Sequence, residues 1–286
     1  MKKILVQLDS DLHASVFDTI AAYDSGADRV LQYGGVSPED VQDLVYGAIF
    51  TRGPDTLQNS AVFVGGSDVG LGEEMLDITR NSFVGPLKVS VMLDSNGCNT
   101  TAAAAVAKMV SEVDLSDRPV TILAGTGPVG MRAAALFAQE GARVTLTSRT
   151  RERAEEVAAS IGDRFGVDVT GMAAEAEDEV RDAVEGAEGV LCAGPPQVML
   201  LPESIWVEHP TLKVMGDLNA VPPLGIEGIK VHWKGKEKHG KIIYGAIGIG
   251  DFKMKVHHAS VARLFEQNDL ILDAEEVYAT AKELLA

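Results

Sequence analysis

A glycine-rich turn in the middle of the chain has the residue types and spacing that hold a phosphate group. Gly125, Gly127 and Gly130 follow an apolar run at residues 120–124 and precede an alanine-rich segment at residues 131–138. Another run rich in β-branched residues comes after a short break. The order strand, GxGxxG, helix, strand is typical of a dinucleotide-binding unit. A helix that starts in this turn would direct backbone N–H groups and a positive dipole end at the phosphates.

Each glycine of this turn has an expected purpose. The first permits a tight turn, the second lets the backbone approach a pyrophosphate, and the third lets the helix and the strand pack closely. The alternative is a glycine-rich turn with a purely structural purpose. We expect the whole turn to contact a dinucleotide, which makes the candidate residues Gly125, Thr126, Gly127, Pro128, Val129 and Gly130.

The end of the second strand indicates which dinucleotide binds. An NAD-preferring site usually has an acidic residue there, whereas this chain has Ser148 and Arg149. Both can bind a 2′-phosphate through charge-assisted hydrogen bonds, worth roughly 1.5–3 kcal/mol each. Arg151 could do the same or lie on the solvated face of the next helix, and we assign Arg153 to that face. The sequence therefore predicts NADP as the cofactor, and NAD remains open as a second one.

Later segments provide further candidates for cofactor binding. An apolar strand that starts at residue 189 ends in a turn where a fold of this kind passes the nicotinamide ribose, and another strand ends near residue 219. Residues 242–250 are interpreted as a strand that breaks into glycines, where backbone can approach a ligand closely. The residues expected at the nicotinamide end are Ala193, Gly194, Asn219, Gly248 and Gly250.

Two strands in the first hundred residues end alike. Asp9 and Asp11 follow the first of them, and Asp94 and Asn96 follow the last. Ligands of open α/β sheets bind beyond the carboxyl ends of the strands, so these side chains are expected to face a cleft. The alternative is that they are turn formers and helix caps. Asn99 is predicted to cap the next helix.

Strand and helix patterns alternate along the whole chain, which is typical of an α/β protein. We expect two α/β domains with an active-site cleft between them. Residues 1–104, joined by C-terminal helices at residues 254–286, would form the substrate domain. Residues 105–253 would form a Rossmann-type NAD(P)-binding domain.

The composition narrows the class of partner. The 286 residues carry a net charge of −17, which argues against nucleic acid or an anionic membrane surface. Two cysteines are too few for a disulfide framework or a metal site. No apolar stretch reaches the roughly 18 residues of a membrane span. We therefore expect a soluble, cytoplasmic protein that holds no metal and binds neither nucleic acid nor membrane.

The chain lacks an obvious catalytic base. An alcohol-oxidising dehydrogenase needs a group that takes the hydroxyl proton, and no residue has a pattern that indicates this function. His257 lies at helical spacing among apolar residues and is interpreted as a packing residue. The absence of a base is informative if the hydride donor is not an alcohol.

Four segments, residues 93–104, 123–132, 219–226 and 245–250, together resemble the bacterial methylenetetrahydromethanopterin dehydrogenases of one-carbon metabolism. Shorter matches near both ends extend the resemblance over nearly the whole chain. It implies NAD(P) as cofactor, a tetrahydromethanopterin-type pterin as substrate, and a homo-oligomer, a trimer or a hexamer.

The resemblance also implies a reaction that needs no base. Hydride leaves a carbon between two nitrogens, whose lone pairs stabilise the resulting cation, and no proton moves. The rate would come from orienting the two rings and from a negative field at the developing positive charge. A lysine could hold the pterin through hydrogen bonds, with Lys255 as the first candidate and Lys253 as the second. The residues assigned to catalysis are Lys255, Asp94 and Asp18, and those assigned to substrate binding are Asn96, Asn99 and Lys253.

Three other functions remain open at this point. The first is the same reaction on the folate analogue. The second is a shikimate-type dehydrogenase, whose grip on NADP resembles Ser148 and Arg149, although the chain has no Asn-Val-Thr-x-Pro-like motif. The third is a non-catalytic protein that senses NADP.

Overall fold

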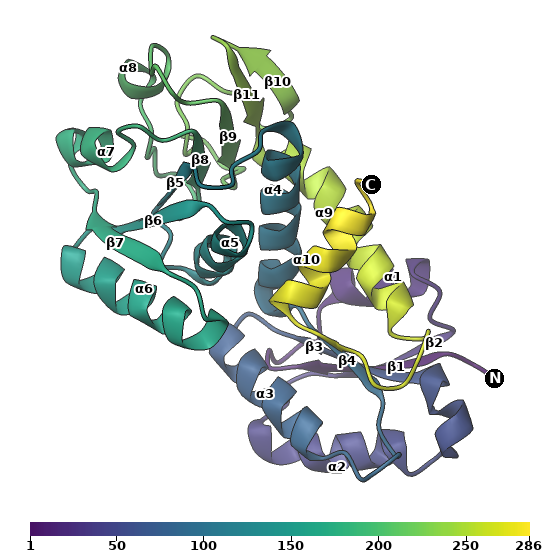
Figure 1. The fold of residues 1–286 in the computed structure, drawn as a ribbon. Helices are drawn as coiled ribbons and strands as arrows, with labels where there is room; N and C mark the ends of the chain where they lie inside the picture. Colours follow the sequence, from purple (N-terminus) through teal and green to yellow (C-terminus); the bar gives the residue numbers. More distant parts are fainter. The chain divides into compact units, whose positions relative to one another are not determined.

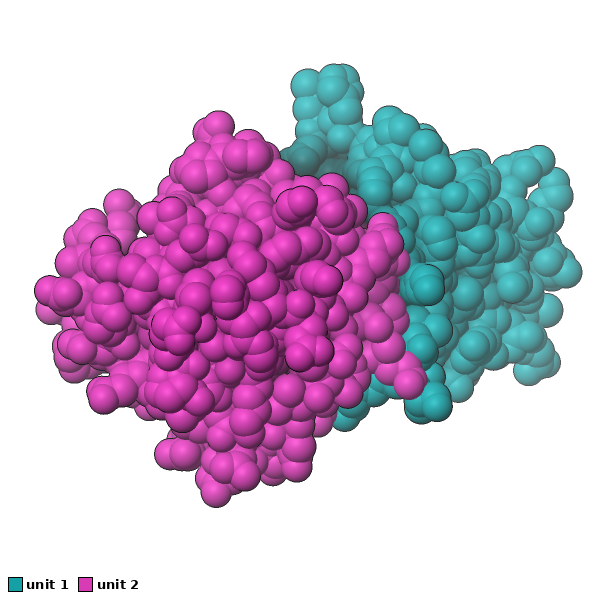
Figure 2. Space-filling model, turned by 90° about the horizontal axis from the view of Figure 1, so that it is seen from above, with its two compact units in different colours: residues 1–100, 254–284, 286 teal, residues 101–253, 285 magenta.

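A computed structural model describes residues 1–286, which form two compact units. Unit 1 comprises residues 1–100, 254–284 and 286, and unit 2 comprises residues 101–253 and 285; Figure 2 colours them separately. Each unit has its own sheet with helices packed on it (Figure 1). The predicted fold class, two α/β domains of which the second is Rossmann-type, is confirmed.

The sheet of unit 1 has five parallel strands in the order β12-β4-β3-β1-β2. The central strands are buried along their length because helices cover both faces, and they are accordingly apolar runs. The strands are β1 (Ile4–Asp9), β2 (Arg29–Tyr33), β3 (Ser60–Gly65), β4 (Ser90–Leu93) and β12 (Ile271–Leu272).

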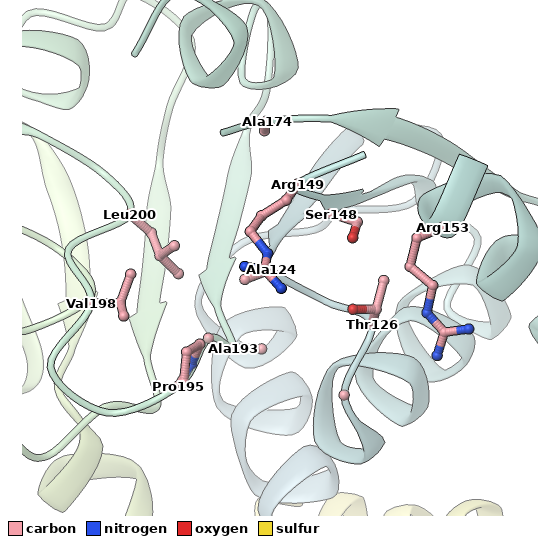
Figure 3. A pocket seen from close by; sticks show the side chains of 12 residues that line it. Ala124, Thr126, Ser148, Arg149, Arg153, Ala174, Ala193, Pro195, Val198 and Leu200 are labelled. Atoms are coloured by element: carbon pink, nitrogen blue, oxygen red, sulfur yellow. The ribbon is translucent and has the colours of Figure 1, made fainter. Parts of the chain in front are cut away.

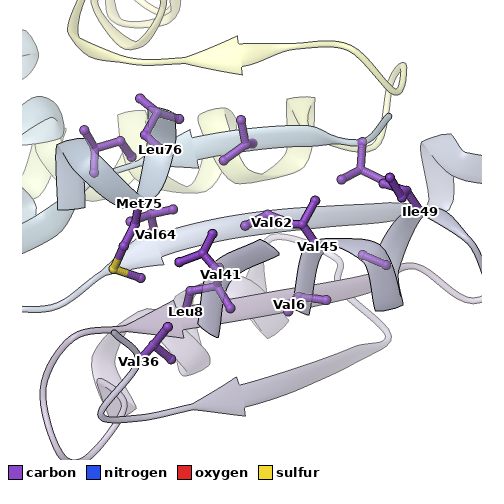
Figure 4. Close-up of a cluster of buried hydrophobic side chains, with 14 of the residues drawn as sticks. Val6, Leu8, Val36, Val41, Val45, Ile49, Val62, Val64, Met75 and Leu76 are labelled. Atoms are coloured by element: carbon purple, nitrogen blue, oxygen red, sulfur yellow. The ribbon is translucent and has the colours of Figure 1, made fainter. Parts of the chain in front are cut away.

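Helices α2 (Pro38–Ile49) and α3 (Val69–Asn81) cover one face of this sheet (Figure 1). Their apolar sides meet alternate residues of the strands in one cluster of buried side chains (Figure 4). Each side chain buried there contributes roughly 1.5–3 kcal/mol. The remaining elements of the unit are α1 (Val16–Asp24), the short helices η1 (Pro54–Asn59) and η2 (Ser95–Gly97), and α10 (Ala274–Glu283).

The sheet of unit 2 has seven strands in the order β10-β11-β9-β8-β5-β6-β7. Apart from the antiparallel β10–β11 hairpin its strands are parallel, and they follow the doubly wound order of a Rossmann fold. The order reverses between β5 and β8. The strands are β5 (Pro119–Leu123), β6 (Arg143–Ser148), β7 (Val169–Ala173), β8 (Gly189–Cys192), β9 (Val214–Asp217), β10 (Lys234–Lys238) and β11 (Lys241–Tyr244).

Four helices belong wholly to unit 2, and two others cross the boundary between the units. The first group comprises α5 (Pro128–Gln139), α6 (Arg151–Phe165), α7 (Glu177–Ala183) and α8 (Glu203–Trp206). The second comprises α4 (Cys98–Glu112) and α9 (Ala246–Arg263). No helix of the chain is both long and apolar enough to cross a membrane.

The predicted strand over residues 242–250 is wrong beyond Tyr244, because helix α9 already starts at Ala246. The glycines here let two pieces of backbone meet. A Cβ on Gly245 would lie 2.6 Å from the carbonyl oxygen of Val231, and a Cβ on Gly248 would collide with that of Trp233. Close contact within the protein therefore accounts for glycine at positions 245 and 248.

Candidate active site

The turn between β5 and α5 uses its three glycines in different ways. A Cβ on Gly130 would lie 2.6 Å from the Cα of Gly125, and a Cβ on Gly125 would lie 2.9 Å from Ile122 Cγ2 and 3.0 Å from Leu146 Cγ. A Cβ on Gly127, at the N-cap of α5, would have no atom within 4 Å. The first and third glycines thus serve close packing, while the second leaves open space before the N-terminus of α5.

A cavity of about 820 Å³ opens at this turn (Figure 3). It lies at the carboxyl ends of β5, β6 and β8, where the strand order reverses and α/β sheets bind their ligands. Its lining residues are Ala124, Thr126, Gly127, Ser148, Arg149, Arg153, Ala174, Ala193, Gly194, Pro195, Val198 and Leu200.

About half of the predicted cofactor residues line this cavity. They are Thr126, Gly127, Ser148, Arg149, Ala193 and Gly194. The others lie outside its lining: Gly125, Pro128, Val129, Gly130, Arg151, Asn219, Gly248 and Gly250. Gly125 and Gly130 shape the turn from within the protein, as described above.

The three arginines after β6 differ in where they lie, and Arg149 lines the cavity as predicted. Arg153, assigned to a solvated face, is half exposed and donates to the carboxylate of Glu156 at 2.8 Å, and it also lines the main cavity and a smaller one of about 320 Å³ beside it. Arg151 lines neither, and its guanidinium lies 3.8 Å from the carboxylate of Glu155. At the start of α6 the hydroxyl oxygen of Thr150 accepts a hydrogen bond from the amide of Arg153.

Asn219 stabilises a loop rather than the cavity surface. Its Nδ2 donates to the carbonyl oxygen of Pro223 at 2.9 Å, and its Oδ1 accepts from the amide of Val221 at 2.8 Å. Both bonds lie within the segment that follows β9. The side chain therefore fixes the shape of this loop.

In unit 1, two of the acidic residues at the strand ends also hold loops together. Asp9 is buried, and its carboxylate accepts hydrogen bonds from the amides of Asp11 (2.9 Å) and Ser15 (2.8 Å). The carboxylate of Asp11 accepts from the amide and the hydroxyl of Ser67, at 3.1 and 2.7 Å. The interpretation as turn formers thus holds for Asp9 and Asp11, because their oxygens accept hydrogen bonds from N–H and O–H groups of nearby loops.

Asp94 forms a buried pair with His257. The Asp94 carboxylate accepts from the amide (2.9 Å) and the hydroxyl (2.6 Å) of Thr100, and its Oδ2 lies 3.2 Å from His257 Nδ1. Both side chains of the pair are fully buried. The rings of Phe17 and Phe63 lie 6.1 and 5.7 Å from the imidazole. The imidazole Nε2 has no hydrogen-bond partner in the chain, so His257 is more than the packing residue expected from the sequence.

Asp18 and Asn96 are the predicted residues that remain accessible at this edge of the sheet. Asp18 is half-buried in the first turn of α1, and its carboxylate lies 3.6 Å from where a Cβ on Gly65 would be. Asn96 is exposed and adopts a left-handed conformation with φ of 52°. Asn99, by contrast, is not a cap: it is buried, and its Nδ2 donates to the Leu93 carbonyl and to Asp273.

The two candidate lysines lie on different sides of helix α9. Lys253 precedes His257 by four residues, so the two share one face of the helix. Lys255 is exposed and is rotated from Lys253 by about 200°. The helix geometry therefore associates Lys253, and not Lys255, with the buried pair.

Comparison with known proteins identifies the family. Residues 16–96 match the family described as methylene-tetrahydromethanopterin dehydrogenase, N-terminal, and residues 119–204 match the family described as NADP oxidoreductase, coenzyme F420-dependent. Two proteins of Methylorubrum extorquens (strain AM1) align over 99% of each chain. "Bifunctional protein MdtA" is 47% identical, and "NAD(P)-dependent methylenetetrahydromethanopterin dehydrogenase" is 33% identical. The chain belongs to the methylenetetrahydromethanopterin dehydrogenase family.

The resemblance noted in the sequence is thereby confirmed. Among solved structures, the ligand-free 5-ketofructose reductase of Gluconobacter sp. strain CHM43 shares the fold at 14% identity, with a TM-score of 0.52 over 99% of each chain. Within this chain, the first family match includes Asp18, Asp94 and Asn96, and the second includes the glycine turn and Arg149.

Sequence reasoning missed one wall of the cavity. Pro195, Val198 and Leu200 line it from the segment after β8, and Ala174 lines it from the end of β7. None of these residues has a side chain with chemistry of its own or belongs to a motif. The available signal was the run Val198-Met199-Leu200, an apolar stretch in a loop next to two prolines.

Proposed function

We propose that this protein transfers a hydride from methylenetetrahydromethanopterin to NADP, giving methenyltetrahydromethanopterin and NADPH. The observation that carries the proposal is the cavity at the Rossmann switch point, where Ser148, Arg149 and Arg153 gather at the end of β6 with no acidic residue among the main cavity's lining. The two full-length relatives support the same reaction, since one of them is named for it.

The residues of the cavity fit a dinucleotide phosphate. Gly127 leaves open space before the N-terminus of α5, where backbone N–H groups and the helix dipole favour a pyrophosphate. The guanidinium groups of Arg149 and Arg153 and the hydroxyl of Ser148 fit a 2′-phosphate. Glu175 borders only the smaller cavity. A site with two cations and one hydroxyl favours NADP, and we keep NAD as a weaker second cofactor.

The reaction balances without a proton. The C–H bond of the methylene carbon breaks with both electrons, the hydride goes to the nicotinamide ring, and the nitrogen lone pairs share the remaining positive charge. The protein has to orient the two rings and to stabilise that charge. We assign this stabilisation to the carboxylates of Asp18 and Asp94, with Asp94 acting from the interior beside His257.

A lysine of α9 is proposed to hold the pterin through hydrogen bonds. Lys253 is the stronger candidate because it shares a helix face with His257, and Lys255 is the second. Asn96, exposed beyond β4, is proposed as a further substrate contact. We also propose a cytoplasmic homo-oligomer, a trimer or hexamer, that binds neither nucleic acid nor membrane, consistent with the charge of −17.

The test is the formation of NADPH, followed by its absorbance with methylenetetrahydromethanopterin as donor. Parallel reactions replace NADP by NAD, and the pterin by its folate analogue or by shikimate. Rapid turnover with NADP and the methanopterin substrate is expected. Faster turnover with the folate analogue or with shikimate would assign another substrate. Tight NADP binding without turnover of any donor would contradict the enzymatic function and favour a non-catalytic protein that senses NADP.

A further inference from the structure

A single buried carboxylate organises the loop that follows β9. Asp217 is fully buried at the end of this strand. Its Oδ1 accepts a hydrogen bond from the amide of Asn219 at 2.9 Å, and its Oδ2 accepts from the amide of Ile226 at 3.1 Å. Gly225 lies against the same carboxylate, since a Cβ on that glycine would lie 2.6 Å from Oδ1. Residues 218–226 thus close around the two oxygens of one side chain.

The far end of this loop is attached to the cofactor cavity. The carbonyl oxygen of Gly225 accepts hydrogen bonds from the amides of Leu200 (2.8 Å) and Leu201 (2.9 Å). The amide of Glu227 donates back to the carbonyl oxygen of Leu201 at 3.0 Å. The segment held in this way, residues 193–201, provides five of the lining residues: Ala193, Gly194, Pro195, Val198 and Leu200.

Leu200 both receives this attachment through its backbone amide and lines the cavity with its side chain. Its Cδ1 lies 2.8 Å from where a Cβ on Gly194 would be, and the Cβ of Ala124 lies 3.1 Å from the same point. Figure 3 shows Pro195, Val198 and Leu200 together on one side, apart from the arginine side of the cavity. A displacement of the loop would therefore move an apolar wall of the dinucleotide site.

We propose that Asp217 is a positioning residue of the cofactor site, which acts on the cavity through residues 218–226 and 193–201. It contacts no cofactor itself. This inference rests on the proposed function, because it assumes that the cavity holds the dinucleotide.

The chemistry of the Asp217 side chain favours a role in positioning the cofactor site over a role in the stability of the fold alone. Burial raises the pKa of the Asp217 carboxyl, and the pKa of the neighbouring Cys192 thiol is raised by burial and by the Asp217 charge. A buried carboxylate stabilises a fold poorly, since desolvation offsets much of what its hydrogen bonds contribute. It does select one backbone path, because only a residue with two acceptor oxygens can receive N–H groups from both ends of the loop.

The test replaces Asp217 by Asn, which keeps the shape but offers one acceptor oxygen and an NH2 group. At least one backbone N–H then loses its partner, and the wall held by Gly225 loosens. The Kd and the KM for NADP are expected to rise about tenfold, because binding must then reorder a wall that the parent protein already holds in place. The same factor should apply to NAD, since the wall lies apart from the 2′-phosphate side. The kcat and the KM for the pterin should change less than twofold.

A matched control separates positioning from lost stability. Val214→Ala opens a cavity in the same strand, at a buried residue at the opposite end from the loop. It should lower Tm and leave the Kd for NADP unchanged at temperatures where the protein is folded. If Asp217→Asn changes the Kd for NADP no more than Val214→Ala does, Asp217 is only a structural residue and the proposal fails.

Hydrogen exchange on the unmodified protein provides a test that needs no variant. NADP should slow exchange at residues 218–226 as well as at residues 125–130, although the loop is outside the cavity lining. Slower exchange at residues 125–130 with no change at residues 218–226 would overturn the positioning role alone. No change at either segment would instead contradict the dinucleotide site on which the inference rests.

Discussion

The glycine turn yields a prediction that separates cofactor binding from stability. Gly127→Ala adds a methyl group at the N-cap of α5, where no protein atom lies within 4 Å. The residue has φ of −83° and ψ of 168°, which alanine adopts without strain. The new methyl group would occupy the space before the N-terminus of α5, where we place the pyrophosphate. The variant should therefore fold normally and bind dinucleotides poorly.

The expected magnitudes follow from the two environments of this residue. Alanine is a poorer N-cap than glycine by roughly 0.5–1 kcal/mol, and it stabilises by about 0.4–1 kcal/mol through the unfolded chain. The free energy of unfolding should therefore change by less than about 0.5 kcal/mol. Loss of one hydrogen bond to the pyrophosphate costs roughly 1.5–3 kcal/mol. This corresponds to an increase of about 10- to 150-fold in the Kd for NADP.

The assay combines calorimetric titration with NADP and NAD and unfolding in guanidinium chloride. The two Kd values should rise by the same factor, because both cofactors have the same pyrophosphate. Gly130→Ala is the control from the same turn. Its Cβ would lie 2.6 Å from the Cα of Gly125, which is backbone and cannot rotate away. That variant should lose at least about 1–3 kcal/mol of stability.

One result would refute this reasoning. If Gly127→Ala is as stable as the parent protein and still binds NADP with unchanged Kd, no pyrophosphate lies at the N-terminus of α5. The cavity would then hold a different ligand or hold the dinucleotide in another orientation. A loss of affinity for NADP but not for NAD would place the added methyl group near the 2′-phosphate instead.

Three further predictions concern Arg149 with Arg151 as its control, the two candidate lysines, and His209. Arg149→Ala should raise the KM for NADP about 10- to 100-fold and the KM for NAD less than threefold. Arg151 lies outside the cavity lining, so Arg151→Ala should change neither KM. Equal effects of Arg149→Ala on both cofactors would contradict the assignment of Arg149 to the 2′-phosphate. Lys253→Ala should lower kcat/KM for the pterin at least about tenfold with the KM for NADP unchanged, and Lys255→Ala should do so less; the reverse order would favour Lys255. Burial lowers the pKa of His209 below 6.5, so the stability that its neutral form contributes is present above pH 6.5 and is lost as the pH falls through the lowered value. Between pH 7.5 and pH 5.5 the free energy of unfolding should therefore fall more for the parent protein than for His209→Gln. Equal falls for the two proteins would contradict this.

The cofactor half of the site was largely predictable because its signals are local. The turn, its strand and its helix are contiguous, and Ser148 and Arg149 directly follow the next strand. Arg153 was missed because a charged residue in the first turn of a helix has the same sequence pattern whether it faces solvent alone or also borders a cavity. The apolar wall at residues 195–200 was missed for a different reason, since it is positioned by hydrogen bonds from a loop some 25 residues later.

The glycines at the end of β11 show how one composition supports two structures. A strand that ends in a glycine-rich segment and a helix that begins in one can have the same sequence pattern. The helix is formed here because Gly245 and Gly248 let its first turn lie against the backbone carbonyls of residues 230–233. That contact joins two segments about 15 residues apart, and neither segment alone indicates it.

The strand-end carboxylates show where the chemistry of the site could not be assigned from sequence. Asp9 and Asp94 follow similar strands, yet what each can do depends on which groups donate to it. The Asp9 carboxylate accepts hydrogen bonds from amides of the following loop. The Asp94 carboxylate also lies within hydrogen-bond distance of the imidazole of His257, a residue 163 positions later in the chain. We propose that the Asp94 carboxylate acts on the developing cation through a medium of low dielectric constant, where a charge has more effect than in water. The function proposed for Asp94 therefore depends on His257, which the sequence pattern alone assigns to packing.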